Sequence, residues 1–135
     1  MEVSPYLNFD GQCATAFRFY EQCLGGRIEM LQTYDQSPMK EQAPAGWREK
    51  VIHARLAVGG NLLMGCDAPP GRYAAPQGIT VSISVPPADA ERIFKELAEG
   101  GRITMPFEKT FWSPGFGMLV DRFGTPWMVN SEQTA

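Results

Sequence analysis

The chain contains a single histidine, His53, in a segment that alternates in the manner of a strand from residue 50 to 58. Alternation places His53 on one face with Val51, Arg55 and Ala57. An imidazole can act as a base or as a polar anchor near neutral pH, so His53 is the first candidate for a catalytic residue. The alternative is a hydrogen-bonded strand histidine without a chemical role, and the pattern by itself favours that alternative.

Cys66 is the other residue with reactive potential, because it ends the apolar segment 61–66 and precedes Asp67. A nucleophilic thiol needs a lowered pKa from a nearby cation or a helix N-terminus. The neighbouring sequence offers neither, so we interpret Cys66 as a buried and inert thiol. Cys13 and Cys23 lie beside or on an expected helix and are interpreted as packing residues. Three widely spaced cysteines without a C-x-x-C pair fit a reducing cytosol better than a disulfide framework.

Glycine and proline residues divide the chain into short segments with strand or helix periodicity. In the first half we expect a helix over residues 14–24, because apolar residues recur there at intervals of three and four until Gly25. Strict alternation over residues 79–85 predicts the strand that opens the second half, and a helix follows it over 88–99. Further strands are expected at 3–9, 28–34, 50–58, 61–66, 103–107, 111–120 and 126–130, with a loop at 35–47.

A sequence repeat links the two halves. The segment Gly25-Gly26-Arg27-Ile28-Glu29-Met30 recurs as Gly100-Gly101-Arg102-Ile103-Thr104-Met105. In each half the motif directly follows an expected helix, so each half has the order strand–helix–strand–strand–strand. A unit of this size buries too little surface to be stable alone, so the halves are expected to share a core, pair their sheets or exchange between two chains. We predict one domain over 1–135, with module one at 1–67, a connector at 68–77 and module two at 78–135.

The composition is that of an ordinary globular protein. The 135 residues suit a single domain, and contents of 44% hydrophobic and 20% charged residues argue against disorder. The 12 Lys and Arg residues against 15 Asp and Glu residues give a net charge of −3, which disfavours a nucleic-acid-binding protein. No apolar stretch is long enough to span a membrane, and residues 1–5 lack the features of a signal peptide. We therefore expect a cytoplasmic protein with neither nucleic acid nor a membrane as its partner.

Three motifs spread over nearly the whole chain carry a family resemblance. They are Pro5-Tyr6-Leu7-Asn8-Phe9 followed by Ala16-Phe17-x-Phe19-Tyr20, then Val51-Ile52-His53-Ala54-x-Leu56, and finally Asp121-Arg122-Phe123-Gly124-x-Pro126-Trp127-Met128-Val129-Asn130. Through them the chain resembles the vicinal oxygen chelate (glyoxalase/bleomycin-resistance) superfamily, and within it the PhnB-like, or 3-demethylubiquinone 3-methyltransferase-like, branch. The resemblance implies an α+β fold of two tandem βαβββ modules that form a curled mixed sheet around a cleft. The methyltransferase name finds no support in the residues, since no glycine-rich nucleotide loop follows a first strand.

The resemblance also implies where a metal ion would bind. In metalloenzymes of the superfamily, each module gives one ligand from its first strand and one, usually Glu, from its last strand, and the ion acts as a Lewis acid. The corresponding positions here hold Pro5 or Tyr6, Met64, Thr80 and Met128. Thioethers suit soft ions such as Cu(I) and do not suit hard ions, and a chain with one histidine cannot form a two-histidine site. We therefore expect no metal and no cofactor.

A cleft without charged ligands predicts a binding site for a small molecule, because such sites combine aromatic walls with a few polar groups. The residues expected to bind the ligand lie on the first strands, at the cleft rim and at the position of the family's Glu: Tyr6, Asn8, Thr80, Ser82, Trp112 and Met128. Two alternatives stay open. One is a metal-dependent enzyme, a lyase or dioxygenase of the glyoxalase superfamily. The other is a drug-sequestering protein of the bleomycin-resistance type. The resemblance to the superfamily also implies a homodimer.

Overall fold

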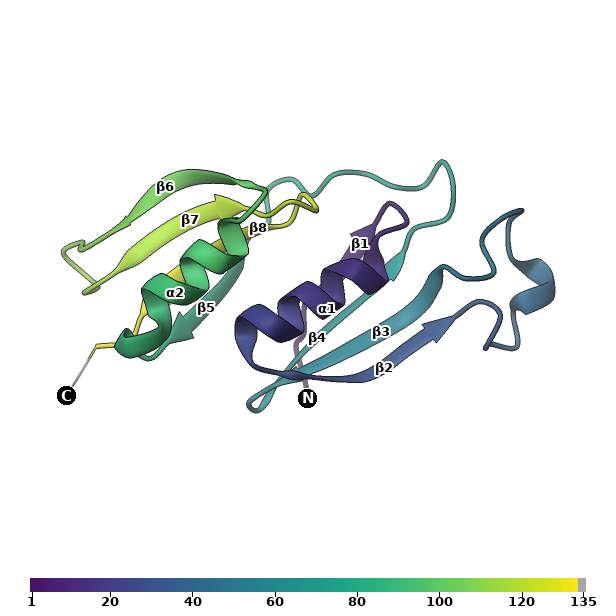
Figure 1. The fold of residues 1–135 in the computed structure, drawn as a ribbon, viewed down its shortest axis with the longest axis horizontal. Helices are drawn as coiled ribbons and strands as arrows, with labels where there is room; N and C mark the ends of the chain where they lie inside the picture. The colour runs from purple at the N-terminus through teal and green to yellow at the C-terminus, as the bar shows by residue number, and fades with distance from the viewer. Residues whose placement is uncertain (134–135) are drawn as a thin grey trace. The chain divides into compact units, whose positions relative to one another are not determined.

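The computed structural model describes residues 1–133. The chain divides into two compact units, unit 1 over residues 1–74 and unit 2 from residue 75 onward. Each unit consists of one four-stranded sheet and one α-helix that lies against it (Figure 1). In the described part of the chain, no helix is long and apolar enough to cross a membrane.

Unit 1 has the strand order β1-β4-β3-β2, in which β1 is parallel to β4 and the other pairs are antiparallel. A crossover through the helix is what brings the first strand parallel to the last. The elements in chain order are β1 (Tyr6–Phe9), α1 (Cys13–Leu24), β2 (Arg27–Thr33), a 3₁₀ turn (Lys40–Gln42), β3 (Val51–Val58) and β4 (Asn61–Asp67).

Unit 2 repeats this topology with the order β5-β8-β7-β6, in which β5 is parallel to β8. Its elements are β5 (Val81–Val85), α2 (Pro87–Ala98), β6 (Arg102–Glu108), β7 (Phe116–Val120) and β8 (Pro126–Ser131). The predicted α+β fold of two tandem βαβββ modules is therefore confirmed.

The helix of each unit buries its apolar stripe against one face of its own sheet. In unit 1 the Phe17 ring meets Phe9 edge-on at a centroid distance of 6.1 Å, and Leu56 of β3 is fully buried. In unit 2 the buried side chains Phe94 and Leu97 of α2 lie on the same side as Trp127 of β8. Each unit has one α-helix among residues 1–133, so the opposite face of each sheet has no helix of its own unit over it. We call this the open face.

The repeated Gly-Gly pair has a steric cause that is the same in both units. Gly25 and Gly100 follow the helices with φ of +73° and +77°, a left-handed conformation that glycine adopts without strain. A Cβ on the second glycine would collide with a backbone carbonyl oxygen, that of Ala57 for Gly26 and that of Val120 for Gly101. The motif therefore fixes where the chain leaves each helix and enters β2 or β6.

Three expected strands begin two or more residues before the observed ones. β1 begins at Tyr6 and not at residue 3, because Pro5 has no N–H to donate to the ladder, although its carbonyl accepts from the Met64 N–H at 3.0 Å. β5 begins at Val81, so the predicted strand 79–85 is two residues too long at its start. The predicted strand 111–120 is wrong in its first half, since residues 111–115 belong to no strand and β7 begins only at Phe116.

Candidate functional site

Strand alternation places the polar residues of β1 on the open face of unit 1. Tyr6 and Asn8 are exposed, whereas Phe9 is buried beneath α1. The parallel register sets Tyr6 opposite Met64 and Asn8 opposite Cys66 on β4. Residues directly opposite each other in a sheet project to the same side, so the side chains of these two pairs share the open face.

His53 joins this group from β3. Its neighbours Ala54 and Leu56 are buried toward the helix, and His53 projects to the other side. The Tyr6 hydroxyl lies 3.5 Å from His53 Nδ1, and the two rings stack with a centroid distance of 5.9 Å and an interplanar angle of 26°. Tyr6 on β1 and His53 on β3, each predicted separately as a site residue, are therefore in contact.

The predicted face of β3 needs one correction. Val51 was expected beside His53, but its side chain is only 1% exposed and lies on the buried side. The register between β2 and β3 shifts between Gln32 and Thr33, where Gln32 pairs with His53 and Thr33 with Val51. This irregularity reverses the alternation at the start of the strand, as a β-bulge does.

Cys66 is half-buried and not buried, which corrects its interpretation as a buried thiol. Its Sγ donates to Asn8 Oδ1 at 3.4 Å. Burial is the largest cause that raises the pKa of the Cys66 thiol. Burial, together with the Cys66 contact, likewise raises the pKa of the Tyr6 phenol. We call Tyr6, Asn8, His53 and Cys66 the polar cluster.

Asp67 holds the polar cluster in place from the other side of the sheet. Its carboxylate is buried, with 2% of the residue exposed, and it accepts two backbone hydrogen bonds. Oδ1 accepts from the Cys13 N–H at the start of α1, and Oδ2 accepts from the Val51 N–H at the start of β3, both at 2.9 Å. Asp67 thus joins the end of β4 to α1 and to β3. The local sequence pattern does not indicate this role.

Tyr34 is a further residue near the cluster, and it was not among the predicted site residues. It follows β2, and burial followed by the charges of Cys66 and Asp67 raises the pKa of its phenol. The Tyr34 ring meets Trp47 edge-on at 6.3 Å. The sequence signal for Tyr34 was its place directly after the strand that pairs with His53.

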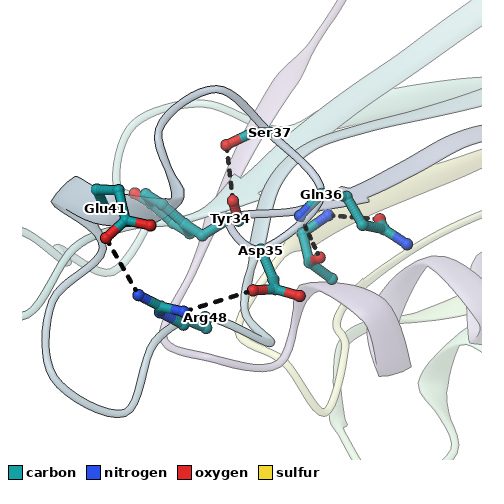
Figure 2. Close-up of polar contacts among 7 residues, drawn as sticks. Tyr34, Asp35, Gln36, Ser37, Glu41 and Arg48 are labelled. Carbon is teal, nitrogen blue, oxygen red and sulfur yellow. Dashed lines mark hydrogen bonds and ion pairs between the residues drawn. The ribbon is translucent and has the colours of Figure 1, made fainter.

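The loop that carries Tyr34, residues 34–50, is held by short-range polar contacts (Figure 2). The Tyr34 N–H donates to Lys50 O at 3.0 Å, which continues the pairing of β2 with β3. Ser37 Oγ donates to Tyr34 O at 2.8 Å, and Arg48 forms ion pairs with Glu41 at 3.5 Å and with Asp35 at 3.9 Å. These contacts give Tyr34 a defined backbone position at the end of β2.

The open face of unit 2 is less polar. Ser82 is exposed and pairs with Met128, and Met128 pairs in turn with Met118 on β7. Met118 pairs with Met105 on β6, so three methionines follow one another across the sheet. Thr80 was expected on the same strand as Ser82 but precedes β5, so strand alternation does not orient it.

Trp112 lies in the loop between β6 and β7. Its ring is in contact with Phe116 at 5.3 Å and with Phe111 at 4.7 Å, and Phe111 is 96% exposed. An open depression of about 270 Å³ adjoins this loop and is lined by Lys109, Thr110, Phe111, Ser113, Pro114 and Gln133. Of the predicted ligand-binding residues, Tyr6 and Asn8 belong to unit 1, and Thr80, Ser82, Trp112 and Met128 belong to unit 2. The catalytic candidate His53 also belongs to unit 1.

The side chains at the family's metal positions do not fit a hard divalent cation. Met64 and Met128 offer neutral thioethers on the open faces, and Tyr6 offers a phenol whose pKa is raised. Such ions prefer carboxylate oxygen or imidazole nitrogen. Over residues 1–133, no three His, Cys, Asp or Glu side chains gather as a group that could hold a metal ion.

Two tandem βαβββ units with these open faces define the class of the protein. The family model of the Glyoxalase/Bleomycin resistance protein/Dioxygenase superfamily matches residues 4–129, and the chain belongs to this family. YjdN of Escherichia coli (strain K12) is 34% identical over 139 residues, an alignment that covers 96% of this chain and 95% of YjdN.

Solved structures give the same fold. Protein PA1353 of Pseudomonas aeruginosa is 46% identical, with a TM-score of 0.91 over 99% of both chains. The PhnB protein of Bacillus cereus is 24% identical, with a TM-score of 0.74 over 98% of this chain and 100% of that chain. The resemblance to the glyoxalase/bleomycin-resistance superfamily is therefore confirmed, and the likeness to the PhnB protein shows the shared fold.

Proposed function

We propose that this chain binds a small organic molecule at the open face of unit 1, with Tyr6, Asn8 and His53 as its polar contacts. The observation that carries the proposal is the convergence of these three side chains with Cys66 on one partly exposed sheet face. A few convergent polar groups beside aromatic rings are typical of small-molecule sites. The open face of unit 2, with Ser82 and Met128, is proposed as a second contact surface of mainly apolar character.

Binding is proposed to proceed without a divalent cation. The donors at the family's ligand positions are uncharged and partly soft, which supports recognition by hydrogen bonds and ring contacts in place of Lewis-acid chemistry. Elemental analysis of protein purified without chelator tests this directly, and we expect less than stoichiometric Mn, Ni, Zn or Fe. A stoichiometric ion that is lost in Tyr6→Phe or Met128→Leu would instead support a metal-dependent lyase or dioxygenase.

Ligand binding itself is tested by thermal stability. We would measure the protein with catechol, 2,3-butanedione and bleomycin as representatives of three ligand classes. A ligand at 100 times its dissociation constant adds about 2.7 kcal/mol to the free energy of unfolding. We expect stabilisation by an uncharged probe, and its loss in Tyr6→Phe. Tyr73→Phe, outside the cluster, is the matched control. A stabilisation that is equal in both variants, or absent for every probe and for a wider fragment set, contradicts the proposal.

A drug-sequestering function is the second candidate, and the exposed aromatic pair in unit 2 favours it. Phe111 is 96% and Trp112 46% exposed, and cations stack on such rings with about 0.5–2 kcal/mol. The net charge of −3 also favours a cationic ligand. Stabilisation by bleomycin that is lost in Trp112→Ala but kept in Tyr6→Phe would support this candidate over the first.

We also propose that the protein is a cytoplasmic homodimer. The described residues contain no disulfide, which fits a reducing compartment. Apolar side chains at the open face of unit 2, such as Met105 at 42% exposure, favour burial in an assembly. Sedimentation equilibrium tests the oligomeric state, and a monomer at micromolar concentration contradicts it.

A further inference from the structure

The side-chain amide of Asn130 has hydrogen-bonding groups that the described part of the chain does not satisfy. Asn130 lies on β8, where Trp127 and Val129 are buried toward α2, so alternation places Asn130 on the open face of unit 2. Its Oδ1 is buried and accepts no hydrogen bond from residues 1–133. A buried acceptor without a partner destabilises a folded protein, and such atoms are rare enough to require an explanation.

The nitrogen of the same amide is also free to bind. Nδ2 of Asn130 donates no hydrogen bond to any of residues 1–133, and the residue as a whole is half-buried, so part of its side chain reaches the surface. The terminal torsion of an asparagine side chain is soft, and its rotation can turn the oxygen toward the surface. One amide therefore offers an acceptor and a donor side by side.

An aromatic surface lies close to this amide. Phe116 on β7 is directly opposite Asn130, and its ring contacts the Trp112 ring at a centroid distance of 5.3 Å. Trp112 is 46% exposed, so its indole ring can stack against a flat ligand. On the other side of Asn130, β5 contributes the exposed Ser84. Aromatic surface with a few polar groups is typical of small-molecule sites.

The loop that carries Trp112 is fixed to the end of β8. The Trp112 carbonyl accepts from Gln133 Nε2 at 2.9 Å, and the Ser131 N–H, directly after Asn130, donates to the Gly115 carbonyl at 2.7 Å. These two bonds hold the indole and the amide in one arrangement before a ligand arrives. A surface that is already ordered loses less conformational entropy on binding.

We propose that the open face of unit 2 binds a planar lactam, a cyclic amide whose N–H and C=O groups lie on the same side. The lactam N–H donates to Asn130 Oδ1, Asn130 Nδ2 donates to the lactam carbonyl, and the ring stacks on Trp112. A ligand with donors alone, such as an ammonium ion, would leave Nδ2 without an acceptor. The inference rests on the proposed function in taking this face as a contact surface, and it deepens that function by naming the ligand class.

The test compares 2-quinolone with N-methyl-2-quinolone, which has the same rings and carbonyl but no N–H. Each compound is titrated into the full-length, ¹⁵N-labelled protein, and dissociation constants are measured from NMR shifts. We expect 2-quinolone to shift the Trp112 indole N–H and Asn130 side-chain signals. The N-methyl compound should bind about tenfold more weakly, because it cannot donate to Oδ1.

Asn130→Leu removes both amide groups and keeps a side chain of similar size. This variant should bind 2-quinolone about tenfold more weakly and should no longer distinguish the two compounds. Asn61→Leu, at an exposed position at the start of β4, is the matched control and should keep both wild-type dissociation constants. The comparison of the two compounds on the wild-type chain does not depend on the folding of any variant.

Equal dissociation constants for the two compounds on the wild-type chain overturn the inference, as does equal binding of 2-quinolone by Asn130→Leu and Asn61→Leu. Shifts confined to the Tyr6 and His53 signals also overturn it, but they leave the proposed binding at unit 1 intact. Conversely, lactam binding that depends on Asn130, without any uncharged probe bound at unit 1, supports the inference and contradicts the proposed role of unit 1.

Discussion

Replacement of Asp67 by alanine tests the strongest structural claim made for unit 1. The substitution leaves two N–H donors, those of Cys13 and Val51, without the carboxylate that each contacts at 2.9 Å. A buried donor left without a partner costs about 1–3 kcal/mol. Because the two donor residues, Cys13 and Val51, are only 0% and 1% exposed, we expect a loss of about 4 kcal/mol in the free energy of unfolding.

Urea denaturation followed by circular dichroism measures this loss, and hydrogen exchange locates it. Protection should fall at the Cys13 and Val51 amides, at the starts of α1 and β3. Asp35→Ala is the matched control, because the Asp35 carboxylate is 58% exposed and its ion pair with Arg48 is 3.9 Å long. Exposed pairs of this kind contribute about 0–1 kcal/mol. A loss below about 1 kcal/mol for Asp67→Ala would refute the role assigned to the carboxylate.

Two further predictions concern the glycine joint and the polar cluster. Gly101→Ala should lower the free energy of unfolding, measured by urea denaturation, by about 2–3 kcal/mol, because the new Cβ meets the Val120 carbonyl. Gly60→Ala is the control: a Cβ there has nothing within 4 Å and should change the free energy of unfolding by less than about 1 kcal/mol. The folded pKa of Tyr6 lies above the unfolded value of about 10, so its stabilising effect is complete below pH 10 and is lost as the pH rises further. As the pH rises from 9 to 11, the urea midpoint should therefore fall less in Tyr6→Phe than in Tyr73→Phe. An equal fall in both variants would contradict the raised pKa of the Tyr6 phenol.

The topology was predictable because its determinants are local and repeated. A Gly-Gly pair follows the helix in each unit because a Cβ on its second glycine would collide with the carbonyl oxygen of Ala57 or Val120. The repeated motif therefore indicated the same helix-to-strand junction in both halves of the sequence. The length of β7 was not predictable in the same way, because Phe111 and Trp112 have strand-forming side chains but lie in bends before Phe116.

The candidate site was predictable only in part. Alternation identified Tyr6 and Asn8 on β1 and His53 on β3, since each strand places every second side chain on one face. It could not place Val51, because a single register shift between β2 and β3 reverses the pattern. The environment of Cys66 depends on a parallel neighbour more than 50 residues away in sequence, the strand that holds Tyr6 and Asn8, and no local pattern reports that pairing.

The separation of helix-covered and open faces has a consequence for how such a chain can change over time. The residues that keep each unit folded lie mostly between its helix and one side of its sheet, and they are alike in the two units. The open faces differ between the units. That of unit 1 carries a phenol, an imidazole and a thiol, and that of unit 2 carries three methionine thioethers beside the hydroxyl of Ser82. The two units thus share a scaffold on whose open faces side chains can be exchanged at little cost to folding.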